Sequence, residues 1–153
     1  MPPLPNPIRS VLIVKLSAIG DVVHALPTLS ALRTLLPEAR IGWMVEQLSS
    51  PLLENHPDLD VLHIVPRRRW RKEGLRTFLR EAPPYFRAIR EEQWDVAIDM
   101  QGLTKSGMVA WASGAKHRVG FGDAEMREFN RFFTHTKVRP EPGLHKAAHN
   151  LAL

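Results

Sequence analysis

Five short apolar runs are separated along the chain by segments whose apolar residues recur at helical spacing. The runs are rich in valine and isoleucine and nearly continuous, as in strands that are buried on both faces of a sheet. Strands that alternate with helices pair in parallel, because each crossover helix returns the chain to the same edge of the sheet. The sequence therefore predicts an α/β fold, a Rossmann-like parallel sheet with helices on both faces. The expected strands are residues 10–15, 41–45, 61–65, 95–100 and 118–121.

The segments between these runs predict helices. Asp21 is placed to cap the first of them, in which Pro27 either introduces a kink or marks the first turn. The segment after the third run leads to a helix that ends near Gln93 and is interrupted by Pro83 and Pro84. Further helices are expected over 50–55, 104–112, 124–133 and from residue 145, with an extended piece at 134–138.

The length of 153 residues fits one domain, expected over 9–153 after a proline-rich, disordered lead-in at 1–8. The chain has no cysteine, which excludes a disulfide framework, thiolate metal sites and a cysteine nucleophile, and which suits a reducing cytoplasm. Its longest apolar runs are too short to span a bilayer, and the lead-in lacks the apolar core of a signal peptide.

Positive charge is concentrated in one segment. Residues 67–90 hold nine basic side chains and two glutamates, whereas the whole chain has a net charge of only +5. Fifteen of the 21 basic residues are arginines, whose planar guanidinium matches carboxylates and phosphates. A charge run of this kind is often a solvated helix face, but several like charges in so few residues favour an anionic partner.

Ligands bind a parallel sheet at the carboxyl ends of its strands. The residues expected there are 16–21, 46–50, 66–72 and 101–106. They contain Asp21, either a plain helix cap or a carboxylate that accepts a proton, and an arginine cluster, RRRWRK. They lack the G-x-G-x-x-G of a dinucleotide site and the acidic pair of a receiver domain. A basic module that binds RNA or DNA remains the non-enzymatic alternative, although the cluster has little aromatic interleaving.

Several motifs occur in a fixed order: VLIVKLSAIGDVVHALPTLSALR, WMVEQ, RRRWRK, DVAIDMQGLTKSG and MRE. In this order the chain resembles glycosyltransferase family 9, the lipopolysaccharide heptosyltransferases, and its type I more than its type II members. The resemblance extends over about residues 9 to 153. It implies that the chain is the N-terminal, acceptor-binding half of an enzyme with the GT-B fold, and that the C-terminal donor-binding domain is absent from this chain.

The resemblance also implies roles for individual residues. Asp21 matches the general base that takes a proton from the acceptor hydroxyl, and residues 17–20 form the loop nearest the donor. The other matches are expected to bind the anionic acceptor. The donor-proximal residues are Ser17, Ala18, Ile19 and Gly20, and the acceptor-binding residues are Arg68, Arg69, Arg71, Lys72, Gln101, Lys105 and Arg127.

The implied activity is the inverting transfer of heptose from ADP-L-glycero-β-D-manno-heptose to Kdo of Kdo–lipid A, in synthesis of the lipopolysaccharide inner core. No metal ion or other cofactor is expected; His145 and His149 have metal-ligand spacing but no evident third ligand. The enzyme is expected to work peripherally, at the cytoplasmic face of the inner membrane. We expect the 153-residue chain to fold alone but to be inactive without a donor domain.

Overall fold

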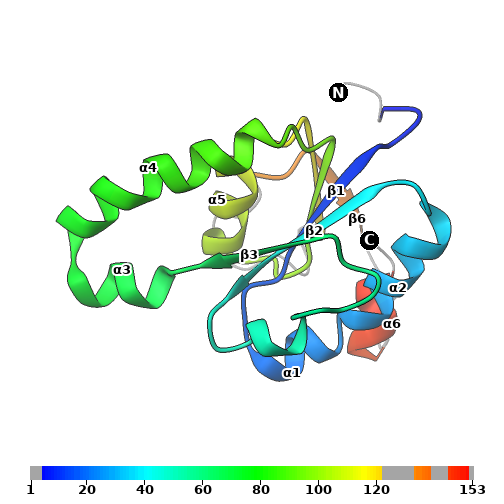
Figure 1. The fold of residues 1–153 in the computed structure, drawn as a ribbon. Coiled ribbons are helices and arrows are strands. Elements are labelled where there is room, and N and C mark those ends of the chain that lie inside the picture. The colour runs from blue at the N-terminus through cyan, green and yellow to red at the C-terminus, as the bar shows by residue number, and fades with distance from the viewer. Residues whose placement is uncertain (1–4, 122–132, 139–144, 152–153) are drawn as a thin grey trace.

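The computed structural model describes residues 5–121, 133–138 and 145–151. Within these ranges six strands form one sheet in the order β3-β2-β1-β4-β5-β6 (Figure 1). Every neighbouring pair is parallel, so the predicted parallel sheet is confirmed. The strands are β1 (Ser10–Val14), β2 (Arg40–Glu46), β3 (Val61–Val65), β4 (Val96–Asp99), β5 (His117–Phe121) and β6 (Thr136–Val138).

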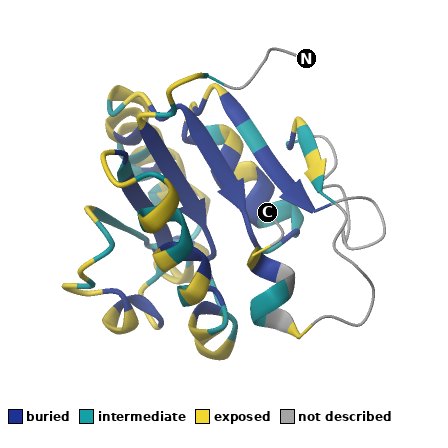
Figure 2. Ribbon diagram, turned by 90° about the vertical axis from the view of Figure 1, so that its right-hand side faces the viewer, coloured by how far each residue is buried: buried dark blue, intermediate teal, exposed yellow. Residues whose placement is uncertain are grey.

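Helices cover both faces of this sheet, whose central strands β2, β1, β4 and β5 are mostly buried (Figure 2). The first two helices cover one face, where the last helix packs against the second. The helices between β3 and β5 cover the other face. The helices are α1 (Ile19–Val23), α2 (Leu26–Leu35), the 3-10 turn η1 (Ser50–Leu52), α3 (Arg67–Glu73), α4 (Leu75–Glu91), α5 (Thr104–Ala112) and α6 (Lys146–Leu151).

The sheet separates two apolar cores, and β1 contributes to both. Val11 and Ile13 point to the side of α1 and α2, whereas Leu12 and Val14 point to the side of α4 and α5. All four side chains are at most 1% exposed. Burying an aliphatic side chain of this size stabilises a fold by about 1.5–3 kcal/mol. The continuous apolar runs of the sequence therefore reflect a central sheet that is covered twice.

Two expectations about the helices are wrong. The prolines Pro83 and Pro84 lie inside α4 and do not interrupt it. A proline removes the N–H that would bond to the carbonyl four residues earlier, here those of Leu79 and Arg80. Leu79 and Arg80 are both exposed, so water can reach the carbonyl groups on that side of the helix. The helix expected over 50–55 is shortened to the single turn η1, and the one expected over 124–133 lies almost wholly outside the described residues.

The residues just before β1 pack against the rest of the domain. Ile8 is half-buried against the core on the α2 side, and the backbone N–H of Arg9 donates a hydrogen bond to the Asp95 carboxylate at 3.0 Å. Residues 1–4 of the expected lead-in lie outside the described ranges. Among the described helices, none has both the length and the apolar character needed to cross a membrane.

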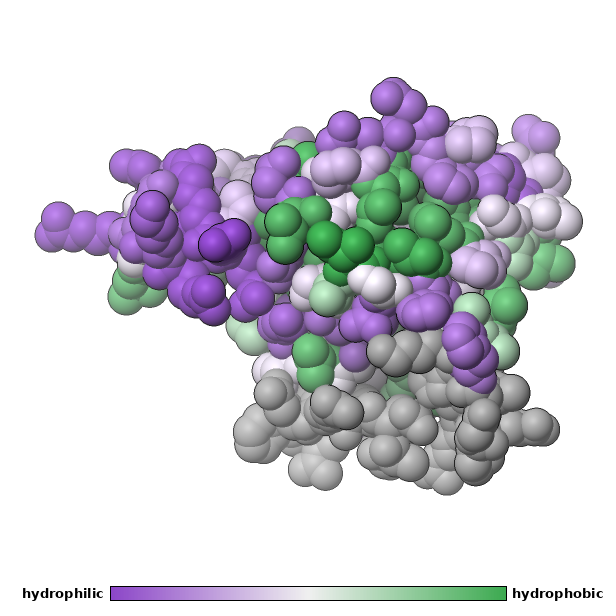
Figure 3. Space-filling model, turned by 90° about the horizontal axis from the view of Figure 1, so that it is seen from below, coloured by the Kyte–Doolittle hydropathy of each residue, from purple (hydrophilic) through white to green (hydrophobic). Residues whose placement is uncertain are grey.

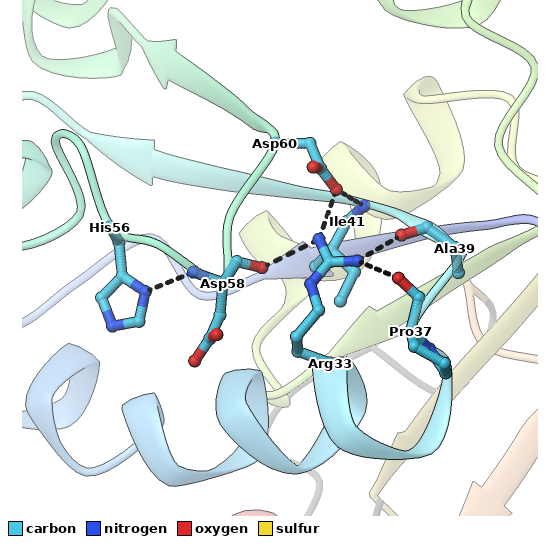
Figure 4. A network of polar contacts seen from close by, with 7 residues as sticks. All are labelled: Arg33, Pro37, Ala39, Ile41, His56, Asp58 and Asp60. Carbon is cyan, nitrogen blue, oxygen red and sulfur yellow. Dashed lines mark hydrogen bonds and ion pairs between the residues drawn. The ribbon is translucent and has the colours of Figure 1, made fainter.

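The amino-terminal edge of the sheet is held by Arg33 at the end of α2 (Figure 4). Its guanidinium donates to the carbonyls of Pro37, Ala39 and Asp58 at 2.8–3.2 Å and to the Asp60 carboxylate at 2.6 Å. The same carboxylate oxygen accepts the N–H of Ile41 at 2.7 Å. One side chain thus ties α2 to the starts of β2 and β3, at the edge opposite the carboxyl ends.

These contacts give stability a pH dependence. Burial raises the pKa of Asp60, but hydrogen bonds from Ile41 and Arg33 and the nearby arginine charges outweigh this effect, so the pKa lies below its ordinary 3.8. We expect Asp60→Asn to lower the free energy of unfolding by about 1 kcal/mol at neutral pH, a modest value because water screens the ion pair of this 45% exposed side chain.

The difference between the wild type and Asp60→Asn is fully present above the ordinary carboxyl pKa and disappears as pH falls through the lowered pKa of the folded state. Urea unfolding of both proteins from neutral to strongly acidic pH measures it. Glu38→Gln, which changes an exposed carboxylate in the turn before β2, is the control. A difference that does not vary with pH would contradict this role of Asp60.

Candidate active site

Asp21 lies at the carboxyl edge of the sheet, in the first turn of α1, where it is half-buried. The prediction that it caps the helix is wrong, because α1 begins at Ile19 and Ala18 holds the capping position. The helix starts early because Gly20 takes a helical conformation instead of forming a tight turn. The positive end of the helix dipole favours a charged carboxylate in the first turn. Asp21 therefore offers a negative charge at this edge.

The loop before α1 is open to solvent. Ser17 is half-buried, whereas Ala18, Ile19 and Gly20 are exposed. Apart from its own helix and chain neighbours, nothing in the described part of the chain lies within 4 Å of the place that a side-chain carbon on Gly20 would occupy. Seen from the side on which α1 lies, the molecule carries an apolar area beside a strongly hydrophilic lobe (Figure 3). A ligand can therefore approach the backbone next to Asp21 closely.

The strand that leads into this loop is fixed by the end of β4. Gln101 accepts the N–H of Leu16 through its side-chain oxygen at 2.9 Å. The ammonium group of Lys15, which is only 8% exposed, donates to the carbonyl of Met100 at 2.7 Å. The carbonyl of Leu16 accepts the N–H of Glu46 at 2.9 Å. The chain entering the loop is thus held by both neighbouring strands.

Asp99 shapes the loop that carries Gln101, a role that the sequence analysis missed. Its carboxylate is fully buried at the end of β4 and accepts the backbone N–H groups of Gln101 and Gly102 at 3.0 and 3.2 Å. The Ser106 hydroxyl donates to the same carboxylate at 3.0 Å and also accepts the N–H of Leu103, the residue that precedes α5. Leu103, and not Thr104, therefore holds the capping position of α5. An aspartate at the end of an apolar strand, with Gln-Gly beginning two residues later, was the available signal.

We expect Gln101→Ala to lower the free energy of unfolding by about 1–2 kcal/mol, because the N–H of Leu16 loses its partner. Gln101→Glu should restore most of this loss, since a carboxylate oxygen also accepts the bond. Urea unfolding, together with amide hydrogen exchange at Leu16, measures both effects. Equal stability of Gln101→Ala and the wild type would contradict this structural role, and contact with a ligand would then be the only role left for Gln101.

The arginine cluster forms α3, which follows β3 at the carboxyl edge. Trp70 anchors this helix: its ring is 5% exposed, and its indole N–H donates to Glu81 of α4 at 3.1 Å. The ring also packs edge to face against the rings of Phe78 and Tyr85, with 5.5 and 5.6 Å between the ring centres. Trp70 thus fixes which way the basic side chains of α3 face.

The structure divides the cluster into paired and unpaired cations. Arg67 forms an ion pair with Glu46 at 2.6 Å, and Arg69 forms ion pairs with both Glu73 and Glu81. Two carboxylates therefore already share the guanidinium of Arg69, which is one of the residues expected to bind the acceptor. In the described part of the chain no ion pair involves the exposed Arg68, Arg71 and Lys72.

The spacing of the unpaired cations matters. Arg68 and Lys72 lie four residues apart, so they are neighbours on one side of α3. Like charges in this arrangement destabilise a helix slightly, and an anionic ligand between them removes the repulsion. Arg71 adds a third charge. Within the cluster of α3, these three residues are the cations that no described carboxylate already binds.

The remaining predicted residues lie on other elements or outside the described ranges. Lys105 is half-buried in the first turn of α5 and faces the space between α5 and α4. Arg127 lies outside the described residues. His145 is exposed, with its ring 5.1 Å from that of His24, and nothing is described of the His149 side chain. Across the described ranges, no group of three acidic or histidine residues is arranged to hold a metal ion.

Comparison with known proteins gives a consistent match. The model of glycosyltransferase family 9 (heptosyltransferase) matches residues 84–153. The lipopolysaccharide heptosyltransferase 1 proteins of Salmonella typhimurium and Escherichia coli K12 are each 36% identical over 117 residues, which is 74% of this chain and 37% of theirs. The Pseudomonas aeruginosa protein of the same name is 33% identical over 119 residues, 77% of this chain and 34% of its own.

A comparison of folds with solved structures leads to the same family. E. coli heptosyltransferase WaaC with ADP-2-deoxy-2-fluoro heptose superimposes with a TM-score of 0.83 at 28% identity, over 93% of this chain and 46% of that one. The chain spans just over a third of the length of the curated relatives that it matches. In sequence and in fold, the chain belongs to glycosyltransferase family 9, the heptosyltransferase family.

Proposed function

We propose that this chain is the acceptor-binding half of an inverting type I heptosyltransferase. The whole enzyme transfers heptose from ADP-L-glycero-β-D-manno-heptose to a Kdo hydroxyl of Kdo–lipid A, during synthesis of the lipopolysaccharide inner core. One observation carries the proposal: the Asp21 carboxylate and the unpaired cations of α3 follow β1 and β3 at the same edge of the sheet. The relatives named lipopolysaccharide heptosyltransferase 1, at 33–36% identity, support type I over type II.

In this proposal Asp21 is the general base. An alcohol is a poor nucleophile until a carboxylate accepts its proton during attack. The acceptor oxygen bonds to the anomeric carbon of heptose from the face opposite the diphosphate, and its proton passes to Asp21. The bond from that carbon to the phosphate oxygen breaks, ADP leaves with the bonding electrons, and the anomeric configuration inverts. The exposed loop Ser17–Gly20 lies closest to the donor.

The acceptor is held by charge. Arginine binds a carboxylate or phosphate through two parallel hydrogen bonds, which fixes orientation as well as distance. In this proposal Arg68, Arg71 and Lys72 hold the Kdo carboxylates and the lipid A phosphates, so that one Kdo hydroxyl faces Asp21. The same charges attract the protein to the anionic cytoplasmic face of the inner membrane, where it works peripherally. The transfer uses no metal ion, so a chelator leaves its rate unchanged.

Binding to the isolated chain tests the acceptor site. We expect the deacylated Kdo-containing headgroup to bind with an affinity that falls as salt rises, and to resist competition by RNA of equal total charge. The deacylated headgroup is chosen because it reports on the charged site alone. Displacement of the headgroup by RNA at equal charge would favour the nucleic-acid-binding alternative instead.

A further inference from the structure

A groove of about 570 Å³ lies between α4 and α5, with the end of β3 and Trp70 at one end. This volume is in the range of sites that bind small organic ligands. The lining is largely apolar and includes Phe78, Leu79, Met108 and Trp111, whose exposed fractions are 40%, 60%, 51% and 54%. Large apolar side chains left open to water in one continuous groove indicate a binding site.

Faces of α4 and α5 form two walls of the groove. On α4 the lining side chains run from Phe78 to Arg90 along one face of the helix. Twelve residues of helix rise about 18 Å, slightly more than the ~15 Å of hydrocarbon in one leaflet of a bilayer. The groove therefore has the length of one extended acyl chain.

Cations border the groove, and none of the described residues that line it is acidic. Arg90 is fixed there, because its Nε donates to the carbonyl of Ala112 at 2.8 Å and its guanidinium lies 5.7 Å from the centre of the Trp111 ring. Neither Arg87 nor Lys105 forms an ion pair within the described ranges. An apolar floor with a basic border matches an amphiphile that has an anionic head.

We propose that this groove binds one acyl chain of the anionic glycolipid acceptor, an inference that rests on the proposed function. Lys105 begins the groove at the carboxyl edge of the sheet, the edge that also carries Asp21 and α3. A chain seated along α4 and α5 leaves its charged head at that edge. The lipid part of the acceptor then positions the sugar, because each buried methylene adds about 0.8 kcal/mol of binding free energy.

A brominated fatty acid tests the proposal on the 153-residue chain. Dibromostearate, used below its critical micelle concentration, carries an anionic head, one acyl chain and no sugar. Bromine quenches tryptophan fluorescence on contact, and Trp111 lies in the groove, whereas Trp43 and Trp94 are at most 1% exposed. Trp70 also lines the groove but is only 5% exposed. We therefore expect saturable quenching that Trp111→Phe largely removes. A cationic amphiphile of the same length should bind at least about tenfold more weakly.

Leu79→Glu places a carboxylate in the groove, and its effect should be a loss of affinity of at least about tenfold. Leu35→Glu is the matched control: this leucine of α2 is 75% exposed and lies on the other side of the sheet. Equal quenching of the two variants would overturn the proposal. So would an absence of quenching in the wild type, or a dimer that only Leu79→Glu dissociates, which would make the groove an interface between copies. Because the probe has no sugar, headgroup binding without quenching refutes only the groove.

Discussion

We expect Asp21→Ala to lower turnover by about 10²–10⁴-fold, the range for loss of a general base, while affinity for the acceptor changes little. The protein to assay is a two-domain enzyme, in which this chain is joined to the C-terminal half of a matched heptosyltransferase. Asp21 is half-buried in the first turn of α1, beside an open loop, so its removal leaves the apolar cores intact. Steady-state kinetics at saturating acceptor and donor measure the effect.

Glu38→Ala is the control for Asp21→Ala, since it removes an exposed carboxylate from the turn before β2 at the opposite edge of the sheet. It should retain full turnover. If Asp21→Ala stays within about twofold of the wild type when chemistry limits the rate, Asp21 is not the base. Unchanged thermal unfolding of the variant assigns any loss of turnover to chemistry.

The second large effect concerns the unpaired cations of α3. Changing Arg68 and Lys72 together to alanine should weaken binding of the Kdo-containing headgroup by about 10–100-fold at low salt, because two charge-assisted hydrogen bonds are lost. The salt dependence of binding should also become flatter, since fewer exposed ion contacts remain to be screened. Titration of the isolated chain at several ionic strengths measures both quantities.

Arg76→Ala with Arg80→Ala is the matched control, because it removes the same net charge from exposed positions on α4. A specific acceptor site responds to the α3 pair far more than to the α4 pair. Equal losses from the two pairs would mean that the basic segment acts only through its overall charge. Circular dichroism should stay the same in both, since all four side chains are exposed.

The strands were predictable because most of them are short runs dominated by apolar residues. The interpretation of 61–65 matches β3 residue for residue, and the runs at 41–45 and 118–121 fall within one residue of β2 and β5 at each end. A strand that is buried on both faces favours apolar residues at successive positions. For the same reason the carboxyl edge, with Asp21, α3 and the Gln101 loop, could be located from the sequence.

Other features depend on contacts that the sequence does not display. Arg69 is neutralised by Glu81, which lies twelve residues away and reaches it only because α3 and α4 pack together. The structural role of Asp99 requires a loop that folds back onto the end of β4. The groove between α4 and α5 arises from two helices separated in sequence by β4. Each of these features depends on contacts between residues that are distant in sequence, and local propensity does not predict such contacts.

Sugar transfer by the two-domain enzyme is the most direct test of the proposed function. ADP-L-glycero-β-D-manno-heptose and Kdo–lipid A are incubated with the two-domain enzyme, with its Asp21→Ala variant and with the 153-residue chain alone, and the products are read by mass spectrometry. We predict a product heavier by one heptose with the two-domain enzyme, a greatly reduced yield with Asp21→Ala, and none with the chain alone. No heptosylated product from a folded two-domain enzyme, or equal yields with and without Asp21, would contradict the proposal.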